Sequence, residues 1–148
     1  MAQPPAIEEP LEIRAAGRAV AVTMRTPGDD DELAIGFLIG EGLLATDATA
    51  VRAEPPADLA GNIVEVDAPL LRPAPERRFY ATSSCGVCGK GALEEIAVLA
   101  AAIDDDLVID GSLLASLPDR LAQPGFKATG GMHAAGLFDA DGTLICER

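Results

Sequence analysis

The fold is decided by a stretch that ends a strand pattern and begins a helix pattern, Thr26-Pro27-Gly28-Asp29-Asp30-Asp31-Glu32-Leu33. Thr26-Pro27-Gly28 interrupts the extended chain, because proline and glycine favour a turn. The acidic run then precedes an apolar segment that contains Phe37 and Leu38. This order is typical of a helix start, where one aspartate caps the free amides and the others lie at the positive end of the helix dipole. A calcium loop would need a different spacing of the aspartates.

Three glycines, Gly36, Gly40 and Gly42, lie within or just after this predicted helix. Glycine lowers the stability of a helix relative to alanine. We therefore expect a neighbouring element to approach the helix closely at these positions.

The segments on either side of the helix alternate as β-strands do. Leu11–Ala15 and Arg18–Thr23 alternate apolar and polar residues around Ala16-Gly17, which predicts a hairpin with a two-residue turn. Two weaker strands are expected around Ala50–Ala53 and Ile63–Val66. An extended linker should follow, because this part of the chain contains Pro69, Pro73 and Pro75.

The second half of the chain also mixes strands and helices. We expect a strand at Phe79–Thr82, a helix at Lys90–Ala102, a helix at Ser112–Leu121 that Ser112 caps and Pro118 weakens, and a hairpin of Gly130–Phe138 with Thr143–Cys146. This order predicts the α/β or α+β class. We place a β-rich part with one helix at residues 1–75 and a second domain, which carries the loop with Cys85 and Cys88, at residues 76–148.

The composition excludes several classes of protein. A hydrophobic content of 49% in 148 residues excludes a disordered chain. The formal charge of -13 disfavours binding to nucleic acid. No apolar stretch approaches the ~20 residues of a membrane span, and the N-terminus has no signal-peptide pattern, so we expect no membrane partner. Three cysteines are too few for a disulfide framework, which favours a cytoplasmic location.

The residues that carry chemistry form one loop, Ser83-Ser84-Cys85-Gly86-Val87-Cys88-Gly89-Lys90. Two thiols at this spacing can face each other on a tight turn, where they can bind zinc, exchange disulfides or carry sulfur as a persulfide. Between Arg77 and Leu93 the chain has three cations and no acid. Positive charge and a helix N-terminus lower the pKa of a thiol. The loop therefore predicts a nucleophilic thiol site that would also attract an anionic ligand.

Two other uses of these thiols stay open. A non-catalytic zinc module could use Cys85, Cys88, His133 and Cys146, although their spacing matches no usual zinc motif. A dithiol oxidoreductase would instead form a reversible Cys85–Cys88 disulfide. Cys146 on its own is expected to be a buried strand residue, and we assign no metal site.

A second motif is Thr129-Gly130-Gly131-Met132-His133-Ala134-Ala135. Two glycines before a strand can present their amides to an anion, or they can simply bend the chain. His133 is the only histidine, so any acid–base role of an imidazole falls on it, and otherwise we expect it to be hydrogen-bonded. Gly130, Gly131 and His133 are the candidates for cofactor contacts.

Taken together, these motifs resemble those of the formate dehydrogenase accessory sulfurtransferases, the FdhD type. The matching segments are Pro10-Leu11-Glu12-Ile13-Arg14, Thr26-Pro27-Gly28-Asp29-Asp30, Glu32-Leu33-Ala34-Ile35-Gly36-Phe37, Gly40-Glu41-Gly42, Cys85-Gly86-Val87-Cys88-Gly89 and Thr129-Gly130-Gly131-Met132-His133-Ala134-Ala135. They occur in the order of the family and extend over nearly the whole chain.

The resemblance implies an N-terminal β-rich part followed by the first portion of a cytidine-deaminase-like fold. It implies a sulfur carrier, or sulfurtransferase, that accepts persulfide sulfur from a cysteine desulfurase. The acceptor would be molybdenum in bis-molybdopterin guanine dinucleotide, a cofactor that is not permanently bound and that formate dehydrogenase then uses. Cys85 would hold the persulfide, and Cys88 would resolve it or relay the sulfur.

The family continues beyond the position that matches Arg148, with a segment similar to Glu-Asp-Val-Gly-Arg-His-Asn. Its later parts complete the deaminase-like sheet and supply much of the cofactor site. We therefore expect a C-terminally truncated chain whose delivery of sulfur is impaired. A truncated sheet would expose strand edges around Thr143–Cys146, which predicts a homodimer or an aggregate.

Overall fold

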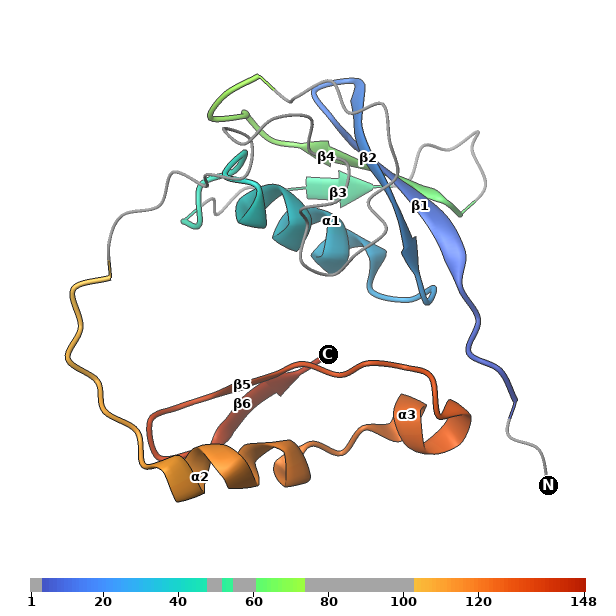
Figure 1. The fold of residues 1–148 in the computed structure, drawn as a ribbon. Coiled ribbons are helices and arrows are strands. Elements are labelled where there is room, and N and C mark those ends of the chain that lie inside the picture. Colours follow the sequence, from blue (N-terminus) through green and yellow to red (C-terminus); the bar gives the residue numbers. More distant parts are fainter. Residues whose placement is uncertain (1–3, 48–51, 55–60, 74–102) are drawn as a thin grey trace, which may run out of the picture. The chain divides into compact units, whose positions relative to one another are not determined.

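The computed structural model of the chain describes residues 4–47, 52–54, 61–73 and 103–148 (Figure 1). The chain divides into two compact units, one within Ile7–Ala101 and one formed by Ala102–Arg148 with Met1–Ala6. Strands and helices are both present, so the predicted α/β class is confirmed. The predicted strand Phe79–Thr82 and helix Lys90–Ala102 lie outside the described residues. The domain boundary at residue 75 and the cytidine-deaminase-like character of the second half stay predictions.

The first unit is built on a four-stranded sheet with the strand order β2-β1-β4-β3. Its strands are β1 (Glu9–Ala15), β2 (Arg18–Arg25), β3 (Arg52–Glu54) and β4 (Ile63–Asp67). β1 pairs antiparallel with β2 and parallel with β4, and β3 pairs antiparallel with β4. β3 and β4 lie where the two weaker strands are expected, and the parallel β1–β4 pair joins segments that are far apart in sequence.

The predicted hairpin of β1 and β2 is confirmed, together with its two-residue turn. Ala16 and Gly17 have φ angles of +51° and +72°. Positive φ at both central residues is the backbone of a type I′ turn, which matches the twist of the flanking strands. The Gly17 amide donates to a carboxylate oxygen of Glu65 at 2.8 Å. Since Glu65 belongs to β4, this bond joins the turn of the β1–β2 hairpin to β4, the strand that lies next to β1 in the sheet.

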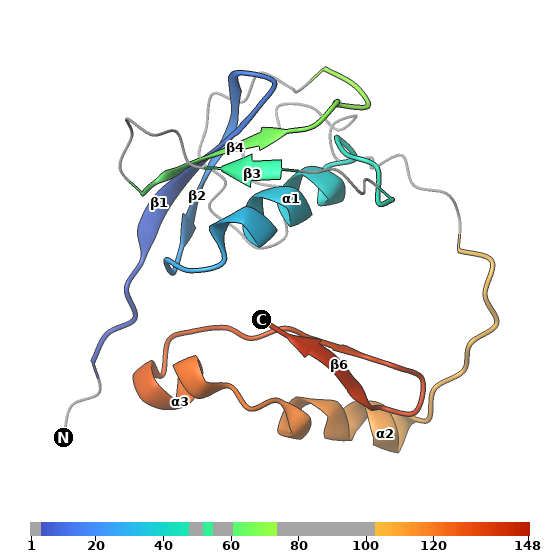
Figure 2. The ribbon, with the colours of Figure 1, turned by 180° about the vertical axis from the view of Figure 1, so that it is seen from behind.

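Helix α1 (Asp30–Gly40) packs against the sheet and completes the core of the first unit (Figure 1, Figure 2). Along β1 the side chains alternate between buried and half-buried positions, as the pleat of a strand requires. The buried apolar side chains of the core are Leu11, Ile13, Ala15, Val20, Ala34, Leu38, Leu43, Leu44, Val64 and Val66. All ten of these described side chains are aliphatic, so this part of the core relies on close packing of aliphatic groups.

One cation is buried in this unit. The side chain of Arg25, the last residue of β2, donates from Nε and Nη2 to the two carboxylate oxygens of Asp30, at 2.8 Å in each case. It also donates to Glu9 at 3.4 Å, to the Gly61 carbonyl at 3.0 Å and to Asn62 Oδ1 at 3.2 Å. The hydrogen bond to Asp30 raises the pKa of Arg25 above its ordinary value. A single side chain thus joins β2 to α1, to the start of β1 and to the chain that enters β4.

The predicted aspartate cap of α1 is wrong. The N-cap residue is Asp29, but its side chain makes no hydrogen bond to the helix amides. Its backbone, at φ −77° and ψ 55°, lacks the extended conformation of a capping residue. The next acid, Asp30, points to Arg25 instead. The acids still occupy the first turn, where the helix dipole favours negative charge.

The end of α1 accounts for one of the three glycines. Gly42 has a φ of +66°. The amides of Gly42 and Leu43 donate to the carbonyls of Ile39 and Leu38, at 2.8 Å in each case. These two bonds form a Schellman motif, which favours glycine at the left-handed position.

The other two glycines do not mark a close approach of a neighbouring element. A Cβ atom added at Gly36 or Gly40 would have no other atom within 4 Å in the part of the chain that the structure describes. The prediction of a tight contact is therefore wrong at both positions.

The start of the predicted linker packs onto the end of α1. The Leu71 amide donates to the Leu43 carbonyl at 2.9 Å, and the Arg72 guanidinium donates to the Glu41 carbonyl at 2.7 Å. A cation at a helix C-terminus is favoured by the helix dipole. Leu70 packs against the core. Residues 68–73 are therefore part of the folded unit.

The second unit combines short helices with a two-stranded sheet. Its elements are α2 (Gly111–Ser116), the 3-10 helix η2 (Leu117–Arg120), α3 (Pro124–Thr129), β5 (Gly136–Phe138) and β6 (Leu144–Glu147). α2 and η2 occupy the predicted helix of residues 112–121. The change to a 3-10 helix occurs at Pro118, which has no amide for an α-helical bond. None of the described helices is long and apolar enough to cross a membrane.

Asp110, and not Ser112, caps α2. The Asp110 carboxylate accepts hydrogen bonds from the Ser112 amide at 2.8 Å and the Leu113 amide at 3.2 Å. The Ser112 hydroxyl donates to the same carboxylate. This bond, followed by the two amide bonds, lowers the pKa of Asp110. The predicted cap is wrong by two positions, because Asp110 has the extended backbone that a cap requires and Ser112 is already helical.

The predicted hairpin of β5 and β6 is confirmed over a shorter length. The first strand begins at Gly136, and not at Gly130, because the unpredicted helix α3 and its C-cap extend to Gly130. The Asp139 carboxylate organises the turn by accepting from the Thr143 amide at 2.8 Å and the Asp141 amide at 3.0 Å. The bond from Thr143 is the main cause that lowers the pKa of Asp139.

Glu147 ties β6 to the segment between η2 and α3. Its two carboxylate oxygens accept from the Gln123 amide at 2.8 Å and the Ala122 amide at 2.9 Å. These bonds, the one from Gln123 first, lower the pKa of Glu147.

We predict that Arg25→Met lowers the free energy of unfolding by roughly 2–3 kcal/mol. The full cost of breaking a buried pair is about 3–5 kcal/mol, and here it is reduced because Asp30 and Glu9 remain partly hydrated. Urea denaturation monitored by circular dichroism measures this change. The matched control is Arg14→Met, whose ion pair with Glu12 is partly exposed and should contribute less than about 1 kcal/mol. Equal effects of the two variants would contradict the assigned role of Arg25.

We also predict that the second unit loses stability in acid. Because the pKa of Glu147 is lower in the folded chain than in the unfolded chain, its contribution is present above the unfolded pKa and is lost as the pH falls through the folded pKa. NMR titration should show the amide protons of Ala122 and Gln123 shifting with a midpoint below the ordinary glutamate value. Glu147→Gln should abolish that titration and leave the Thr143 amide, which follows Asp139, unchanged. A midpoint at or above the ordinary value would refute the assignment.

Candidate functional site

The predicted thiol loop lies outside the described residues. This holds for Cys85 and Cys88 and for the three cations Arg77, Arg78 and Lys90. Their roles stay predictions. The structure does describe the segment from which the chain leads to that loop, and it describes the second motif at residues 129–135.

The segment that leads to the loop is held at the end of α1. Arg72 donates to the carbonyls of Glu41 and Gly42, at 2.7 Å and 3.4 Å. Pro73 is the last described residue before the thiol loop, and Cys85 follows it by twelve positions. A fully extended chain spans at most about 3.6 Å per residue, so Cys85 lies within about 43 Å of Pro73. The thiols are therefore tethered to a fixed point of the first unit.

The second motif begins as the C-cap of α3. Gly130 has a φ of +69°, and its amide donates to the Phe126 carbonyl at 2.7 Å. The Gly131 amide donates to Thr129 Oγ1 at 3.2 Å. Both amides thus end the helix, and an anion would have to compete with these bonds. The cofactor contacts assigned to Gly130, Gly131 and His133 stay predictions.

Cys146 is exposed on β6, so the prediction of a buried residue is wrong. Its partner across the hairpin, Leu137, is 57% exposed. The neighbouring residue on β6, Ile145, is 61% exposed, so the hairpin leaves large side chains of β6 open to solvent. His133 is exposed as well.

Within the part of the chain that the structure describes, no group of three or more His, Cys, Asp and Glu side chains could hold a metal ion. Two of the four residues considered for zinc, Cys85 and Cys88, lie outside that part. The zinc alternative is therefore not tested by the geometry.

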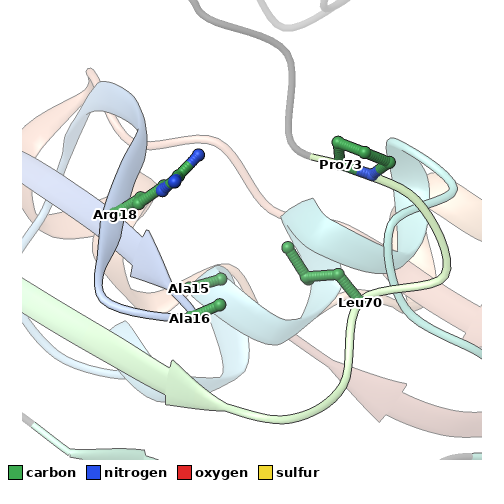
Figure 3. Close-up of a pocket in the computed structure, with 5 residues that line it drawn as sticks. All are labelled: Ala15, Ala16, Arg18, Leu70 and Pro73. Carbon is green, nitrogen blue, oxygen red and sulfur yellow. The ribbon is translucent and has the colours of Figure 1, made fainter.

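The first unit contains a hollow that no sequence motif marks. Its volume is about 290 Å³, and its lining residues are Ala15, Ala16, Arg18, Leu70 and Pro73 (Figure 3). The β1–β2 hairpin supplies three of them, and the segment after β4 supplies the other two. The pairing of β1 with β4 brings these distant segments together. The local sequence pattern of each segment gives no information about its contact with the other segment. The hollow could therefore not be predicted from the sequence.

The chain as a whole matches the FdhD/NarQ family over residues 6–148. It belongs to that family. The resemblance drawn from the motifs is thus confirmed, and the match includes both the Cys85 loop and the Gly130 motif.

Three relatives in the FdhD/NarQ family illustrate the similarity, and each is named "Sulfur carrier protein FdhD". The protein of Mycolicibacterium paratuberculosis is 45% identical over 157 residues, which cover 96% of this chain and 57% of that protein. The protein of Streptomyces avermitilis is 45% identical over 158 residues, which cover 93% of this chain and 54% of that protein. The protein of Picrophilus torridus is 37% identical over 147 residues, which cover 94% of this chain and 55% of that protein.

This FdhD/NarQ chain spans slightly more than half the length of these relatives. No solved structure matches it.

We predict that Cys146 of this FdhD/NarQ chain reacts with iodoacetamide in the folded state as fast as it does in urea, because its side chain is exposed. The experiment uses a Cys85→Ser/Cys88→Ser background, so that one thiol remains. The matched control carries Leu43→Cys with Cys146→Ser in the same background. Its thiol should react only on unfolding, since Leu43 is 0% exposed. Protection of Cys146 in the folded chain would contradict its placement on β6.

Proposed function

We propose that this chain carries sulfur as a persulfide on Cys85. The observation that carries the proposal is the presence of the Cys85-Gly86-Val87-Cys88-Gly89 motif in an FdhD/NarQ chain whose relatives are named sulfur carrier proteins. A nucleophilic thiol is the group that such a carrier needs, and the motif is the only part of the sequence with two thiols close together.

The loading step is a transfer of sulfane sulfur between thiols. The Cys85 thiolate attacks the terminal sulfur of a persulfide on a cysteine desulfurase. The S–S bond of the donor breaks, a new S–S bond forms at Cys85 Sγ, and the donor cysteine leaves as a thiolate. One S–S bond replaces another, so the step needs no oxidant. Arg77, Arg78 and Lys90 lie in the same stretch of sequence and favour the thiolate that attacks.

Cys88 assists in one of two ways. It can take the sulfane sulfur from Cys85 by a second transfer of the same type. Alternatively, its thiolate attacks Cys85 Sγ, releases hydrosulfide and leaves a Cys85–Cys88 disulfide, which thiols of a reducing cytoplasm then reduce. In both cases Cys88 acts after Cys85 has been loaded.

The acceptor in this proposal is reduced molybdenum in bis-molybdopterin guanine dinucleotide. The metal would supply the two electrons that convert the sulfane sulfur into a sulfide ligand, while Cys85 would leave as a thiolate. Formate dehydrogenase then uses the product. The cofactor is a substrate here and binds only transiently. Its phosphates suit the basic stretch of sequence that surrounds the thiols. Gly130, Gly131 and His133 are the candidates for further contacts, within a second domain that forms the first portion of a cytidine-deaminase-like fold.

The test is mass spectrometry of the chain after incubation with a cysteine desulfurase and cysteine. We expect a chain heavier by about 32 Da, one sulfur atom, with the added mass on a peptide that contains Cys85 and removable by dithiothreitol. Cys85→Ser should abolish the added mass, whereas Cys88→Ser should retain it.

Two results would contradict the proposal. One is a folded chain that stays unmodified while the desulfurase is active. The other is an adduct that persists in Cys85→Ser. Stoichiometric zinc that is lost on His133→Ala would favour the zinc module instead, and a reversible Cys85–Cys88 disulfide without added sulfur would favour a dithiol oxidoreductase.

A further inference from the structure

The hollow beside the β1–β2 turn has an apolar floor. Ala15 is 1% exposed and Leu70 is half-buried, whereas Ala16, Arg18 and Pro73 are exposed and form its mouth (Figure 3). Its volume of about 290 Å³ compares with the ~150 Å³ of an engineered cavity that binds benzene. The hollow can therefore hold an apolar side chain.

Arg18 lies at the mouth, and among the described residues it forms no ion pair with a carboxylate. Arg14 and Arg25, in the same unit, do form such ion pairs. Arg72, next to Pro73, donates to backbone carbonyls at the end of α1. At the hairpin turn, the Glu65 carboxylate accepts the Gly17 amide. In a chain of formal charge -13, this combination marks a local site for an anionic group.

The occupant that fits this chemistry is an apolar side chain next to a carboxylate. Among the described lining residues, Arg18 is the only one with a polar side chain. A nucleobase would therefore leave most of its hydrogen-bonding groups unpaired against these residues. An aliphatic or aromatic side chain has no such groups. A carboxylate beside that side chain would reach the guanidinium of Arg18, which can donate two parallel hydrogen bonds to the two carboxylate oxygens.

We propose that the hollow docks the protein that donates sulfur, through a segment in which an apolar side chain seats against Ala15 and Leu70 and an adjacent carboxylate meets Arg18. The inference rests on the proposed function. Its further support is the covalent distance, because Pro73 lines the hollow and Cys85 lies within about 43 Å of it. A donor held at the hollow would therefore be bound only twelve residues along the chain from the thiol that accepts its sulfur.

Two substitutions test the hollow from different sides. Arg18→Glu reverses the charge at the mouth, and Ala16→Asn places a polar amide at its lining. Asparagine tolerates the positive φ of Ala16, and Asn-Gly is a preferred type I′ turn, so the hairpin keeps its fold. The control, Arg148→Glu, makes the same change in net charge in the other unit.

The measurement is calorimetric titration of the full chain, in a Cys85→Ser/Cys88→Ser background, with a purified cysteine desulfurase encoded in the same genome. Arg18→Glu should weaken binding by about tenfold or more, because two like charges would meet. Ala16→Asn should weaken it by about fivefold, the effect of a moderate interface contact. The control should bind like the parent chain, and all variants should unfold at the same temperature.

The outcomes separate this inference from the proposed function. Binding that neither substitution weakens, or no binding of the parent chain, overturns the docking site. Loading of the wild-type chain by a small-molecule persulfide is measured in parallel and does not need the hollow. A chain that binds the desulfurase through the hollow but accepts sulfur from neither donor overturns the proposed function and leaves the docking site in place.

Discussion

Removing a guanidinium from water costs several kcal/mol of folding free energy unless carboxylates pair with it. The buried guanidinium of Arg25 pairs with two carboxylates, which come from different elements. Glu9 comes from the start of β1 and Asp30 from the first turn of α1. Nη2 of Arg25, which also donates to Asp30, donates to the Gly61 carbonyl and to Asn62 Oδ1, where the chain enters β4. Because these partners come from elements far apart in sequence, their bonds define how the sheet and the helix meet. The aliphatic core alone would leave that arrangement less specific, since apolar packing is not directional.

The position of the proposed chemistry follows from this arrangement. The pairing of β1 with β4 brings residues 68–73 back to the end of α1, where Arg72 holds the chain through two backbone carbonyls. The same pairing creates the hollow, because it places Leu70 and Pro73 beside the β1–β2 turn. The fixed position of Pro73, twelve residues before Cys85, and the hollow that we propose as a docking surface are thus consequences of one strand order.

The sequence predicted the elements whose pattern is local. The alternation of apolar and polar residues around Ala16-Gly17 was sufficient to predict the β1–β2 hairpin. The turn residues were sufficient to predict the β5–β6 hairpin. Both helix caps were wrong, because the choice among neighbouring polar residues depends on backbone angles and on tertiary partners such as Arg25. The predicted burial of Cys146 was wrong for a related reason, because the alternation of residues along a strand does not show which face of the sheet other elements cover. The two thiols of the candidate site could be recognised from their spacing, whereas the hollow depends on a contact between distant strands.

A sulfur carrier must release what it accepts, and this requirement separates the proposed function from a thiol that is merely reactive. The most direct measurement loads the chain with radiolabelled sulfur from cysteine and a desulfurase, removes the donor, and mixes the loaded chain with formate dehydrogenase whose molybdenum cofactor is reduced and lacks the sulfur ligand. The account predicts that the label leaves the chain and appears in the cofactor, and that Cys85→Ser transfers none. Label that remains on the chain, or label that reaches the cofactor equally with Cys85→Ser, would contradict it.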